Sequence, residues 1–412
     1  MSRKISLGVA IALALVLVAA SIPLTMLYAR NEQNRIIANL PQRAGQYAAL
    51  EEIRDVADRY YLNEINPGSV NAEMVRGFIA GLGDAKSRYL SGEEYKLYVN
   101  KRNGESPDLG LIAVYEPFVG IMVSQVMPGS PAATSGLQKG DIIQRVEADG
   151  KVILNAPDVT QGNADQMLSE LEKLRAIATE RLSSVAITFQ RDEKTETKTV
   201  LVGHNVPTVF SELMQEDVGY LRITAFYKNT ADQLNSQIKD LTRQGATSLL
   251  LDLRDCAEGS LEYACQALDL FVPAGGQEPM ALVNYRDREP KRYPSSAGAV
   301  TMPGGMAVLV NRLTDGAAEL FAYDLRAFSG GKVQLVGAAR TAGNNTVQEA
   351  FELKSVGGAV VLTVGTVIPY GGGADWCKDG VQVDLAVGNA QLQLSSALTL
   401  LKGSETNNEA QP

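Results

Sequence analysis

Histidine, serine, cysteine and lysine decide which hydrolytic chemistries this chain could support. Among its 412 residues there is one histidine, His204. A zinc site of the HExxH type, a three-histidine zinc site and paired His/Cys zinc fingers are therefore excluded. A Ser-His-Asp mechanism would depend on His204 alone. Hydrolysis would otherwise have to come from carboxylates, from a Ser-Lys or Cys-Lys pair, or from a metal held by oxygen atoms.

Cysteine content and net charge exclude two further classes of protein. The three cysteines, Cys256, Cys265 and Cys377, are too few for a disulfide scaffold and show no CxxC spacing. Cys256 and Cys265 could pair across a turn, but we expect buried thiols. The net charge is -9 and there is no basic cluster. A dedicated nucleic-acid binder is therefore not expected, because nothing could neutralise several phosphates at once.

The segment 5–29 carries no charged residue and is dominated by Leu, Val, Ala and Ile. A helix of this length exceeds the roughly 30 Å hydrocarbon core of a bilayer. Arg3 and Lys4 precede it, which favours a cytoplasmic N-terminus and an exported body. A cleaved signal peptide is the rival interpretation, because residues 18–20 are small. We expect a retained single-pass anchor in the cell membrane, with the bulk of the chain extracytoplasmic.

The region after the apolar segment is predicted to be helical. Apolar residues recur at helical spacing between residues 50 and 60. Asn71 is the expected N-cap of a second helix, and Ser91 with Glu94 has the capping-box pattern of a third. The polar residues 101–107 predict a linker.

Short β-rich runs follow, around one helix predicted at residues 164–178. The loop at residues 128–143 reads PGSPAATSGLQKGDII and resembles the "GSPAxxAGLxxGDxI" segment of PDZ domains. The resemblance implies a β-sandwich domain that binds an extended peptide as an added strand.

A PDZ domain receives the peptide's terminal carboxylate on backbone N–H groups of a glycine-containing turn. In this chain that turn would be formed by Leu109, Gly110 and Leu111. It has one glycine, and Asp108 beside it would repel a carboxylate if it faced the site. We therefore expect a PDZ fold, in which capture of a terminal carboxylate depends on the direction of the Asp108 side chain.

Beyond residue 204, β-rich and helical runs alternate, which predicts a largely parallel sheet covered by helices. The expected strands cover residues 218–226, 248–253, 306–310, 332–336 and 360–368. The expected helices cover residues 231–241, 261–271 and 317–328.

An anchor, a helical segment, a PDZ domain and an αβ core together resemble the C-terminal processing (tail-specific) serine peptidases. Three further stretches carry the resemblance. DAKSRYLS at 84–91 is similar to "DPxSxYLS", and VGYLRI at 218–223 is similar to "IGYIRI". LDLR at 251–254 is identical to the family's "LDLR" motif. The resemblance implies a multidomain α+β fold whose mixed αβ core is a ClpP/crotonase-like layering of sheet and helices. It also implies a Ser-Lys dyad with an oxyanion site of backbone N–H groups.

Compared with the family's motifs, this sequence lacks both members of the dyad. The nucleophile stretch "NxxSASASE" corresponds to NRLTDGAAE at 311–319, which places Gly316 at the attacking serine and keeps Glu319. The base stretch "RTxGKGxVQ" corresponds to RTAGNNTVQ at 340–348, which places Asn344 at the lysine and keeps Gln348. Glycine has no group to attack with, and an amide is not a base near neutral pH.

The oxyanion loop also departs from the family pattern. "LRGNPGG" corresponds to LRDCAEG at 253–259, which keeps Gly259, puts Glu258 in place of a glycine and adds Asp255. Negative side chains there would oppose the charge that develops in the transition state. Because three elements are changed while the scaffold is kept, the sequence predicts a pseudo-peptidase.

Two alternatives remain open. An active endopeptidase could use an unorthodox nucleophile, with Thr314 or Cys256 as the candidates. Thr314 lies two residues before the nucleophile position and would face another direction, and Cys256 has neither a lysine nor a histidine nearby in the sequence. A cation- or ligand-binding module could instead use Asp255, Glu258 and Asp315, on loops that converge on the former active site. We expect no cofactor.

The favoured hypothesis is a membrane-anchored pseudo-peptidase that binds protein C-termini or unfolded segments through its PDZ domain. An active paralogous peptidase is a further candidate partner, and no nucleic acid is expected. The predicted parts are a cytoplasmic N-terminus (1–4), a transmembrane anchor (5–29), a helical region (30–105), a PDZ domain (106–203), a peptidase-like core (204–402) and a disordered tail (403–412).

Overall fold

The computed structural model describes Met26 and residues 48–105, 107–116, 118–156, 170, 182–203, 207–214, 217–272, 279–296, 300, 305–372 and 379–408. Apart from Met26 and residue 170, the expected membrane anchor and the helix expected at 164–178 lie outside these residues, as do His204 and Cys377. Across the described ranges, no helix is both long and apolar enough to span a bilayer.

The chain divides into two compact units, Met1–Glu73 and Met74–Pro412. In the first unit residues 48–60 are helical, as their apolar spacing predicts, and most of their side chains are exposed. Helix α2 (Pro67–Ala80) begins at its proline, a position where the missing N–H needs no partner. Asn71 therefore lies inside a helix, and the predicted N-cap at this residue is wrong.

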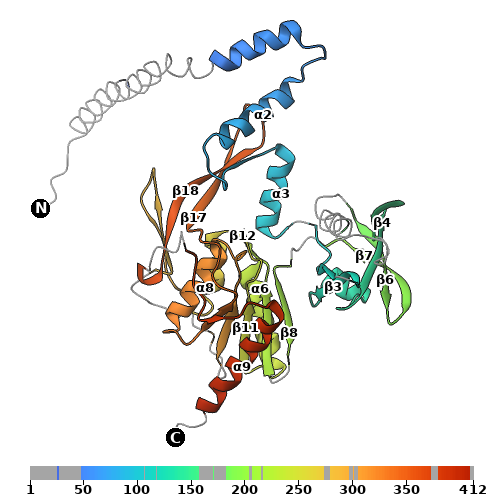
Figure 1. The fold of residues 1–412 in the computed structure, drawn as a ribbon, viewed down its shortest axis with the longest axis vertical. Coiled ribbons are helices and arrows are strands. Elements are labelled where there is room, and N and C mark those ends of the chain that lie inside the picture. The colour runs from blue at the N-terminus through green and yellow to red at the C-terminus, as the bar shows by residue number, and fades with distance from the viewer. Residues whose placement is uncertain are drawn as a thin grey trace, which may run out of the picture. The chain divides into compact units, whose positions relative to one another are not determined.

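The segment that precedes the PDZ-like region contributes a strand to the core, which the helical prediction missed. Strand β1 (Arg88–Leu90) pairs antiparallel with β18 (Ala359–Pro369). Helix α3 (Gly92–Asn103) then begins at the predicted capping box of Ser91 and Glu94. The helix extends into the linker expected at 101–107 and ends at Asn103 (Figure 1).

The PDZ-like region is an antiparallel sheet in the order β2-β3-β4-β6-β7, with β5 beside β4 and β2 at the edge. Its core is formed by alternate side chains, such as Val185, Ile187 and Phe189 of β6. The predicted PDZ signature loop forms the short helix α4, which Ser130 caps. The elements are β2 (Leu111–Glu116), β3 (Gly120–Val126), α4 (Pro131–Ser135), β4 (Ile142–Ala148), β5 (Lys151–Asn155), β6 (Ser184–Arg191) and β7 (Lys194–Leu201).

The αβ core is built on a six-stranded sheet in the order β19-β16-β15-β11-β9-β8. Its strand pairs are parallel except β8 with β9, as the alternation of strands and helices predicts. The strands are β8 (Val209–Leu213), β9 (Val218–Ile223), β11 (Ser248–Asp252), β15 (Met306–Leu309), β16 (Gln334–Gly337) and β19 (Leu385–Ala386). All five residues of β11 are buried, because both faces of the sheet are covered.

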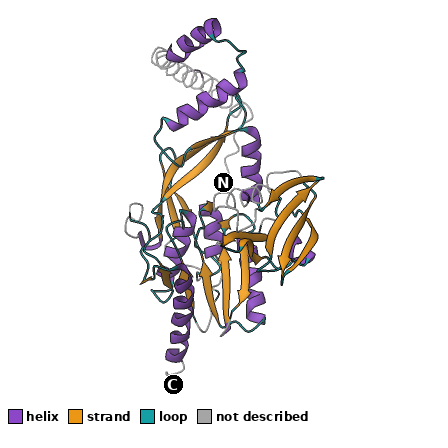
Figure 2. Ribbon diagram, turned by 45° about the vertical axis from the view of Figure 1, so that its right-hand side comes forward, coloured by secondary structure: helices purple, strands orange, loops and turns teal. Residues whose placement is uncertain are grey.

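Helices cover the two faces of this sheet (Figures 1 and 2). Helices α6 (Thr230–Arg243), α7 (Leu261–Leu268) and α8 (Ala317–Phe328) pack on one face, where Phe321 of α8 is fully buried. Helix α9 (Ala390–Asn408) packs on the other face through Ala397 and Leu401. It continues past residue 403, where the sequence predicts a disordered tail.

A second, antiparallel sheet contains the strand expected at 360–368. Strand β18 joins the order β1-β18-β13-β14, with β17 also paired to β18, so it does not extend the parallel sheet. The remaining elements are β10 (Ala225–Phe226), β12 (Glu258–Gly259), β13 (Ala281–Tyr285), β14 (Lys291–Tyr293), β17 (Thr346–Glu352) and the 3-10 turn η3 (Tyr370–Gly372). The residues singled out for the peptidase site lie in the loops after β11, β15 and β16, in the first turn of α8 and on β17.

Candidate active site

Gly316 and Asn344, the two positions predicted to replace the dyad, face each other. Gly316 is the N-cap of α8 and has φ 57° and ψ -106°, a backbone conformation that residues other than glycine rarely adopt. A Cβ atom added to Gly316 would lie 3.3 Å from Asn344 Nδ2. Two side chains at these positions would therefore meet, as a nucleophile and its base must.

Glu319 holds these two positions together. Its carboxylate is fully buried and accepts hydrogen bonds from the N–H groups of Gly316 (2.9 Å), Gly343 (2.7 Å) and Asn344 (2.8 Å), and from the hydroxyl of Thr341. Burial raises the pKa of Glu319, although the hydrogen bonds act in the opposite direction. The residue kept from the family motif therefore fixes the start of α8 against the 341–344 loop.

An ion pair lies beside Gly316 and Asn344. Lys86 Nζ lies 2.5 Å from Asp315 Oδ2, and Asp315 Oδ1 accepts a hydrogen bond of 2.6 Å from Asn344 Nδ2. Asn344 Oδ1 in turn accepts from the N–H (3.0 Å) and hydroxyl (2.6 Å) of Thr346. The amide of Asn344 is thus oriented by both neighbours.

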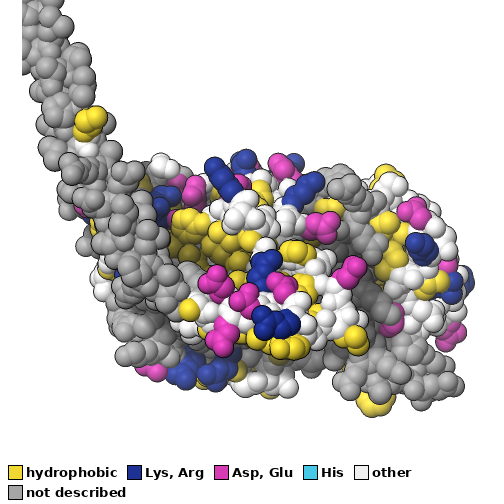
Figure 3. Space-filling view, turned by 90° about the horizontal axis from the view of Figure 1, so that it is seen from above, with side chains coloured by type: hydrophobic (Ala, Val, Ile, Leu, Met, Phe, Trp, Pro, Cys, Tyr) yellow, Lys and Arg dark blue, Asp and Glu magenta, His cyan; other side chains and the backbone are white. Residues whose placement is uncertain are grey.

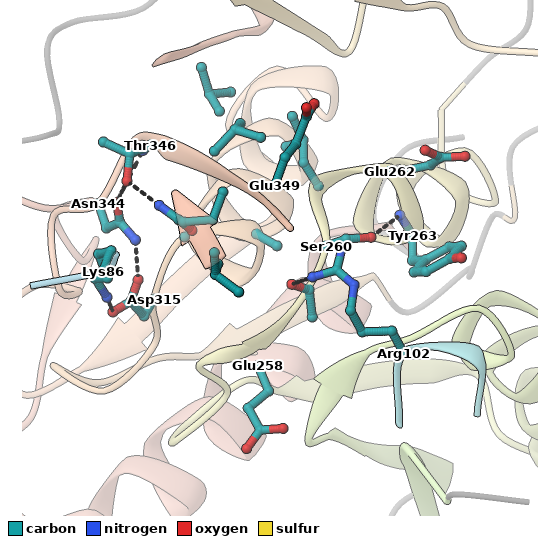
Figure 4. Close-up of a pocket in the computed structure, with 18 of the residues that line it drawn as sticks. Lys86, Arg102, Glu258, Ser260, Glu262, Tyr263, Asp315, Asn344, Thr346 and Glu349 are labelled. Atoms are coloured by element: carbon teal, nitrogen blue, oxygen red, sulfur yellow. Dashed lines mark hydrogen bonds and ion pairs between the residues drawn. The ribbon is translucent and has the colours of Figure 1, made fainter. Parts of the chain in front are cut away.

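These residues line one side of a cavity of about 540 Å³. Figure 4 shows Lys86, Asp315 and Asn344 grouped together, with Arg102 and Tyr263 across the space. Gln348 also lines the cavity and donates to Thr346 Oγ1 at 2.7 Å. The lining is rich in cations and tyrosines, which are Lys86, Arg88, Lys101, Arg102, Lys291, Tyr98, Tyr227, Tyr263, Tyr285 and Tyr293.

Glu258 lines the same cavity, where its carboxylate is paired with Lys101. Burial raises its pKa, but Lys101, at 3.1 Å, and the hydroxyl of Tyr227 outweigh burial and lower the pKa overall. Next to it, Gly259 has φ 131°, and a Cβ atom there would lie 2.5 Å from the carbonyl oxygen of Phe226. Only glycine fits this close approach of two backbones.

Comparisons with known proteins agree with this geometry. Residues 217–387 match the family model "Peptidase family S41", and residues 104–174 match the model "PDZ domain". The chain is a homologue of the C-terminal processing peptidases of family S41. Its core carries that family's fold, with a PDZ domain inserted before it in the sequence.

Two curated relatives illustrate the similarity. The "Carboxy-terminal processing protease CtpA" of Bacillus subtilis is 29% identical over 70% of this chain and 58% of its own length. The "Carboxyl-terminal-processing protease" of Picosynechococcus sp. is 27% identical over 70% of this chain and 66% of its own length. The chain thus matches less than two thirds of either relative. A solved S41-type structure from Bacteroides fragilis has a TM-score of 0.50 at 19% identity, covering 84% of this chain and 90% of that one, which supports the fold alone.

Two stretches that resemble S41 motifs, VGYLRI at 218–223 and LDLR at 251–254, stabilise the loop after β11. The hydroxyl of Tyr220, from VGYLRI, donates to Asp252 Oδ2 at 2.7 Å, and Arg254 Nη2 lies 2.6 Å from the same oxygen. Arg254 also donates to the carbonyl oxygen of Ala390 at 3.0 Å. These contacts anchor the loop at 253–259, which resembles in sequence the oxyanion loop of the S41 peptidases.

Both candidate replacement nucleophiles are buried away from the cavity. Thr314 is fully buried, and its hydroxyl donates to the carbonyl oxygen of Leu253 at 2.8 Å and accepts from the N–H of Asn311 at 3.0 Å. Cys256 is a free, fully buried thiol, and burial raises its pKa. A thiol in that state is not a nucleophile at neutral pH. Cys265 is likewise free and buried, so these two cysteines do not pair.

The three carboxylates considered for a cation site bind separate partners instead. Asp315 pairs with Lys86 and Glu258 with Lys101. Asp255, at φ 62°, accepts from Asn311 Nδ2 at 2.8 Å and lies 3.6 Å from Arg222. Within the described ranges, no group of three acidic, histidine or cysteine residues is placed to hold a metal ion.

Lys86 is the site residue that the sequence did not reveal. It occupies a variable position of the "DPxSxYLS" motif, and 229 residues separate it from Asp315. The antiparallel pairing of β1 with β18 brings this segment to the cavity. No local pattern predicts that pairing.

Proposed function

We propose that this chain is a pseudo-peptidase, a homologue of the C-terminal processing peptidases that binds protein C-termini or unfolded segments without cleaving them. One observation carries the proposal. Gly316 and Asn344 face each other, with a Cβ atom on Gly316 expected 3.3 Å from Asn344 Nδ2, where the chemistry requires a hydroxyl and an amine.

The surrounding charges support this proposal. A serine nucleophile needs a base, and the amide of Asn344 cannot accept a proton near neutral pH. Lys86, an amine that lines the same cavity, is bound to Asp315. The Asp315 carboxylate beside the start of α8 would oppose the negative charge that an acyl-transfer transition state develops.

An active endopeptidase with Thr314 or Cys256 as its nucleophile is less well supported. Both side chains are fully buried, and the Thr314 hydroxyl already donates to a backbone carbonyl. A cation-binding role for Asp255, Glu258 and Asp315 is also less well supported, since each is paired with a cationic side chain.

The binding half of the proposal rests on two surfaces. A PDZ domain suggests binding of peptide C-termini, and the cavity offers tyrosines with cations and carboxylates. Figure 3 shows basic and acidic side chains interspersed around an apolar area, a mixture suited to a polypeptide that carries all three kinds of group.

We propose that residues 5–29 anchor the chain in the cell membrane with its bulk extracytoplasmic, and that an active paralogous peptidase is a candidate partner.

Fluorescent β-casein, an unfolded protein, tests both halves on the full chain in mild detergent. We expect saturable binding, measured by anisotropy, and no turnover, measured by electrophoresis over a day. Turnover that persists in the purified chain and is lost in Thr314→Ala or Cys256→Ala would establish the active alternative. A Thr399→Ala chain serves as the matched control, because Thr399 lies on α9 and does not line the cavity.

A further inference from the structure

The turn before β2 is the part of the PDZ domain expected to receive a ligand's terminal carboxylate. It leads directly into β2, which lies at the edge of the described sheet. An edge strand can pair with an added peptide strand through its main chain. The turn and the edge together therefore decide which polypeptides the domain can take.

The turn is held rigidly by the residues of the signature loop. Gly110 has φ 78°, and its carbonyl oxygen accepts from the hydroxyl of Ser130 at 3.1 Å and from the N–H of Met127 at 2.9 Å. The carbonyl oxygen of Leu109 accepts from the N–H of Ala132 at 2.9 Å. A Cβ atom on Gly110 would lie 2.1 Å from the Cβ of Ser130, so glycine is required here.

The Asp108 side chain accepts from the N–H of Gly110 in this turn, through a hydrogen bond of 2.6 Å to its Oδ1. The main chain of Asp108 is itself fixed, because its N–H and carbonyl each form a 2.8 Å hydrogen bond with Gly203. The carboxylate is thus held at the turn by a backbone that is paired on both sides.

A second carboxylate at this point would compete for the same N–H groups and meet a like charge. Asp108 also has the advantage of being part of the chain, because an intramolecular group acts at a high effective concentration. A ligand segment without a terminal carboxylate meets neither obstacle, since strand addition to β2 uses main-chain groups alone.

We propose that Asp108 fills the carboxylate-binding turn as an internal substitute for a ligand's terminal carboxylate, so that this PDZ domain takes internal extended segments of polypeptides rather than free C-termini. The inference rests on the proposed polypeptide-binding function and selects between its two ligand classes.

Two peptide pools of identical composition test the inference on the full chain in mild detergent. Both are fluorescein-labelled decapeptides with random positions and an apolar last residue. One pool ends in a free carboxylate and the other in a carboxamide. Anisotropy titrations with the unchanged chain should give dissociation constants for the two pools within about threefold, because Asp108 already accepts from the N–H of Gly110 and places a negative charge at the turn. The Asp108→Gly variant should prefer the free acid by about tenfold or more, as a charge-assisted hydrogen bond to a vacated N–H requires.

Asp108→Asn keeps the side-chain oxygen but removes the charge, and should give a smaller preference of the same sign. It also keeps the test open if Asp108→Gly folds poorly. Asp149→Gly is the matched control, since Asp149 is an exposed aspartate of the same domain at φ 48°, and it should behave like the unchanged chain.

A tenfold preference of the unchanged chain for the free acid would overturn the inference. So would Asp108→Gly and Asp108→Asn chains that gain no preference, or that bind neither pool. These outcomes are separate from those of the proposed function. Cleavage of β-casein would contradict the pseudo-peptidase and leave the comparison of peptide ends intact.

Discussion

Lys86 Nζ lies 2.5 Å from Asp315 Oδ2, and the other oxygen of the same carboxylate accepts from Asn344. The pair therefore places an amine and a carboxylate beside Gly316, where the S41 peptidases use a serine and a lysine. The amine here belongs to a different segment of the chain and is bound to a carboxylate. We interpret the pair as a structural replacement for the dyad.

This interpretation predicts energetic coupling between Lys86 and Asp315. Their side chains are 42% and 18% exposed, so the pair is only partly screened by solvent. Lys86→Met and Asp315→Asn should each lower the free energy of unfolding by about 0.5–1 kcal/mol, and the double variant should lose little more than either. Urea denaturation of the four chains gives the coupling energy.

The exposed pair Lys198–Glu196 on β7 provides the matched control, with both side chains 41% exposed. Its coupling energy should be smaller, near the lower limit of about 0.2 kcal/mol for surface pairs. Additive losses in the Lys86–Asp315 cycle would show that the pair does not hold the site together.

Glu319 should be the residue whose charge-neutral substitution disturbs the site most. Glu319→Gln turns an acceptor oxygen into an N–H₂ group that faces at least one N–H donor of Gly316, Gly343 or Asn344. We expect the free energy of unfolding to fall by about 2–4 kcal/mol, because two buried polar groups lose their partners. Glu289→Gln, at an exposed position, should change it by less than about 0.5 kcal/mol. Equal effects of the two substitutions in urea denaturation would contradict this role.

Returning the serine at position 316 should not restore turnover. Gly316→Ser places an L-residue at φ 57° and ψ -106°, with its Cβ 3.3 Å from Asn344 Nδ2. The expected loss in the free energy of unfolding is about 1–3 kcal/mol. Gly388→Ser, at an open position without a positive φ, should lose much less. A Gly316→Ser chain that is as stable as the unchanged chain and digests β-casein would show that the site is one substitution from activity.

Asp108 predicts a specific pH dependence of stability. Burial raises its pKa to about 6, against hydrogen bonds from the Gly110 and Leu109 amides and the charge of Lys101, which lower it. Because the folded pKa lies above the unfolded value of 3.8, the stability linked to this carboxyl is present at pH 4 and is lost as the pH rises through 6.

The free energy of unfolding of the unchanged chain, relative to Asp108→Asn, should therefore decrease between pH 4 and pH 7. Urea denaturation at several pH values measures the difference, in which the other carboxylates cancel. A difference that rises with pH would mean that the Asp108 carboxylate stabilises the turn in its ionised form.

The sequence predicted those features that depend on local patterns or on motif spacing. The capping box at Ser91 and the helix after Gly316 are confirmed. Local hydrogen bonds and the residues at the N-cap determine both.

Long-range pairing explains what the sequence did not predict. The run at 360–368 has strand propensity, but propensity does not name a partner, and β18 pairs with β1, β13 and β17 rather than with the parallel sheet. Lys86 reaches the site only through that pairing. Helix α9 was missed because its stability comes from packing of Ala397 and Leu401 on the sheet. The charge of Asp108 is visible in the sequence, but the direction of its carboxylate depends on the hydrogen-bonded backbone of the turn.

Labelling with a fluorophosphonate probe tests the central claim most directly. The probe forms a covalent bond with an activated hydroxyl nucleophile, so it reports the dyad without requiring a known substrate. The full chain and the Bacillus subtilis C-terminal processing protease would be treated side by side, with mass spectrometry of the intact proteins. We predict that the Bacillus relative is labelled and this chain is not. A labelled adduct on this chain, on Thr314 or on any other residue, would contradict the account.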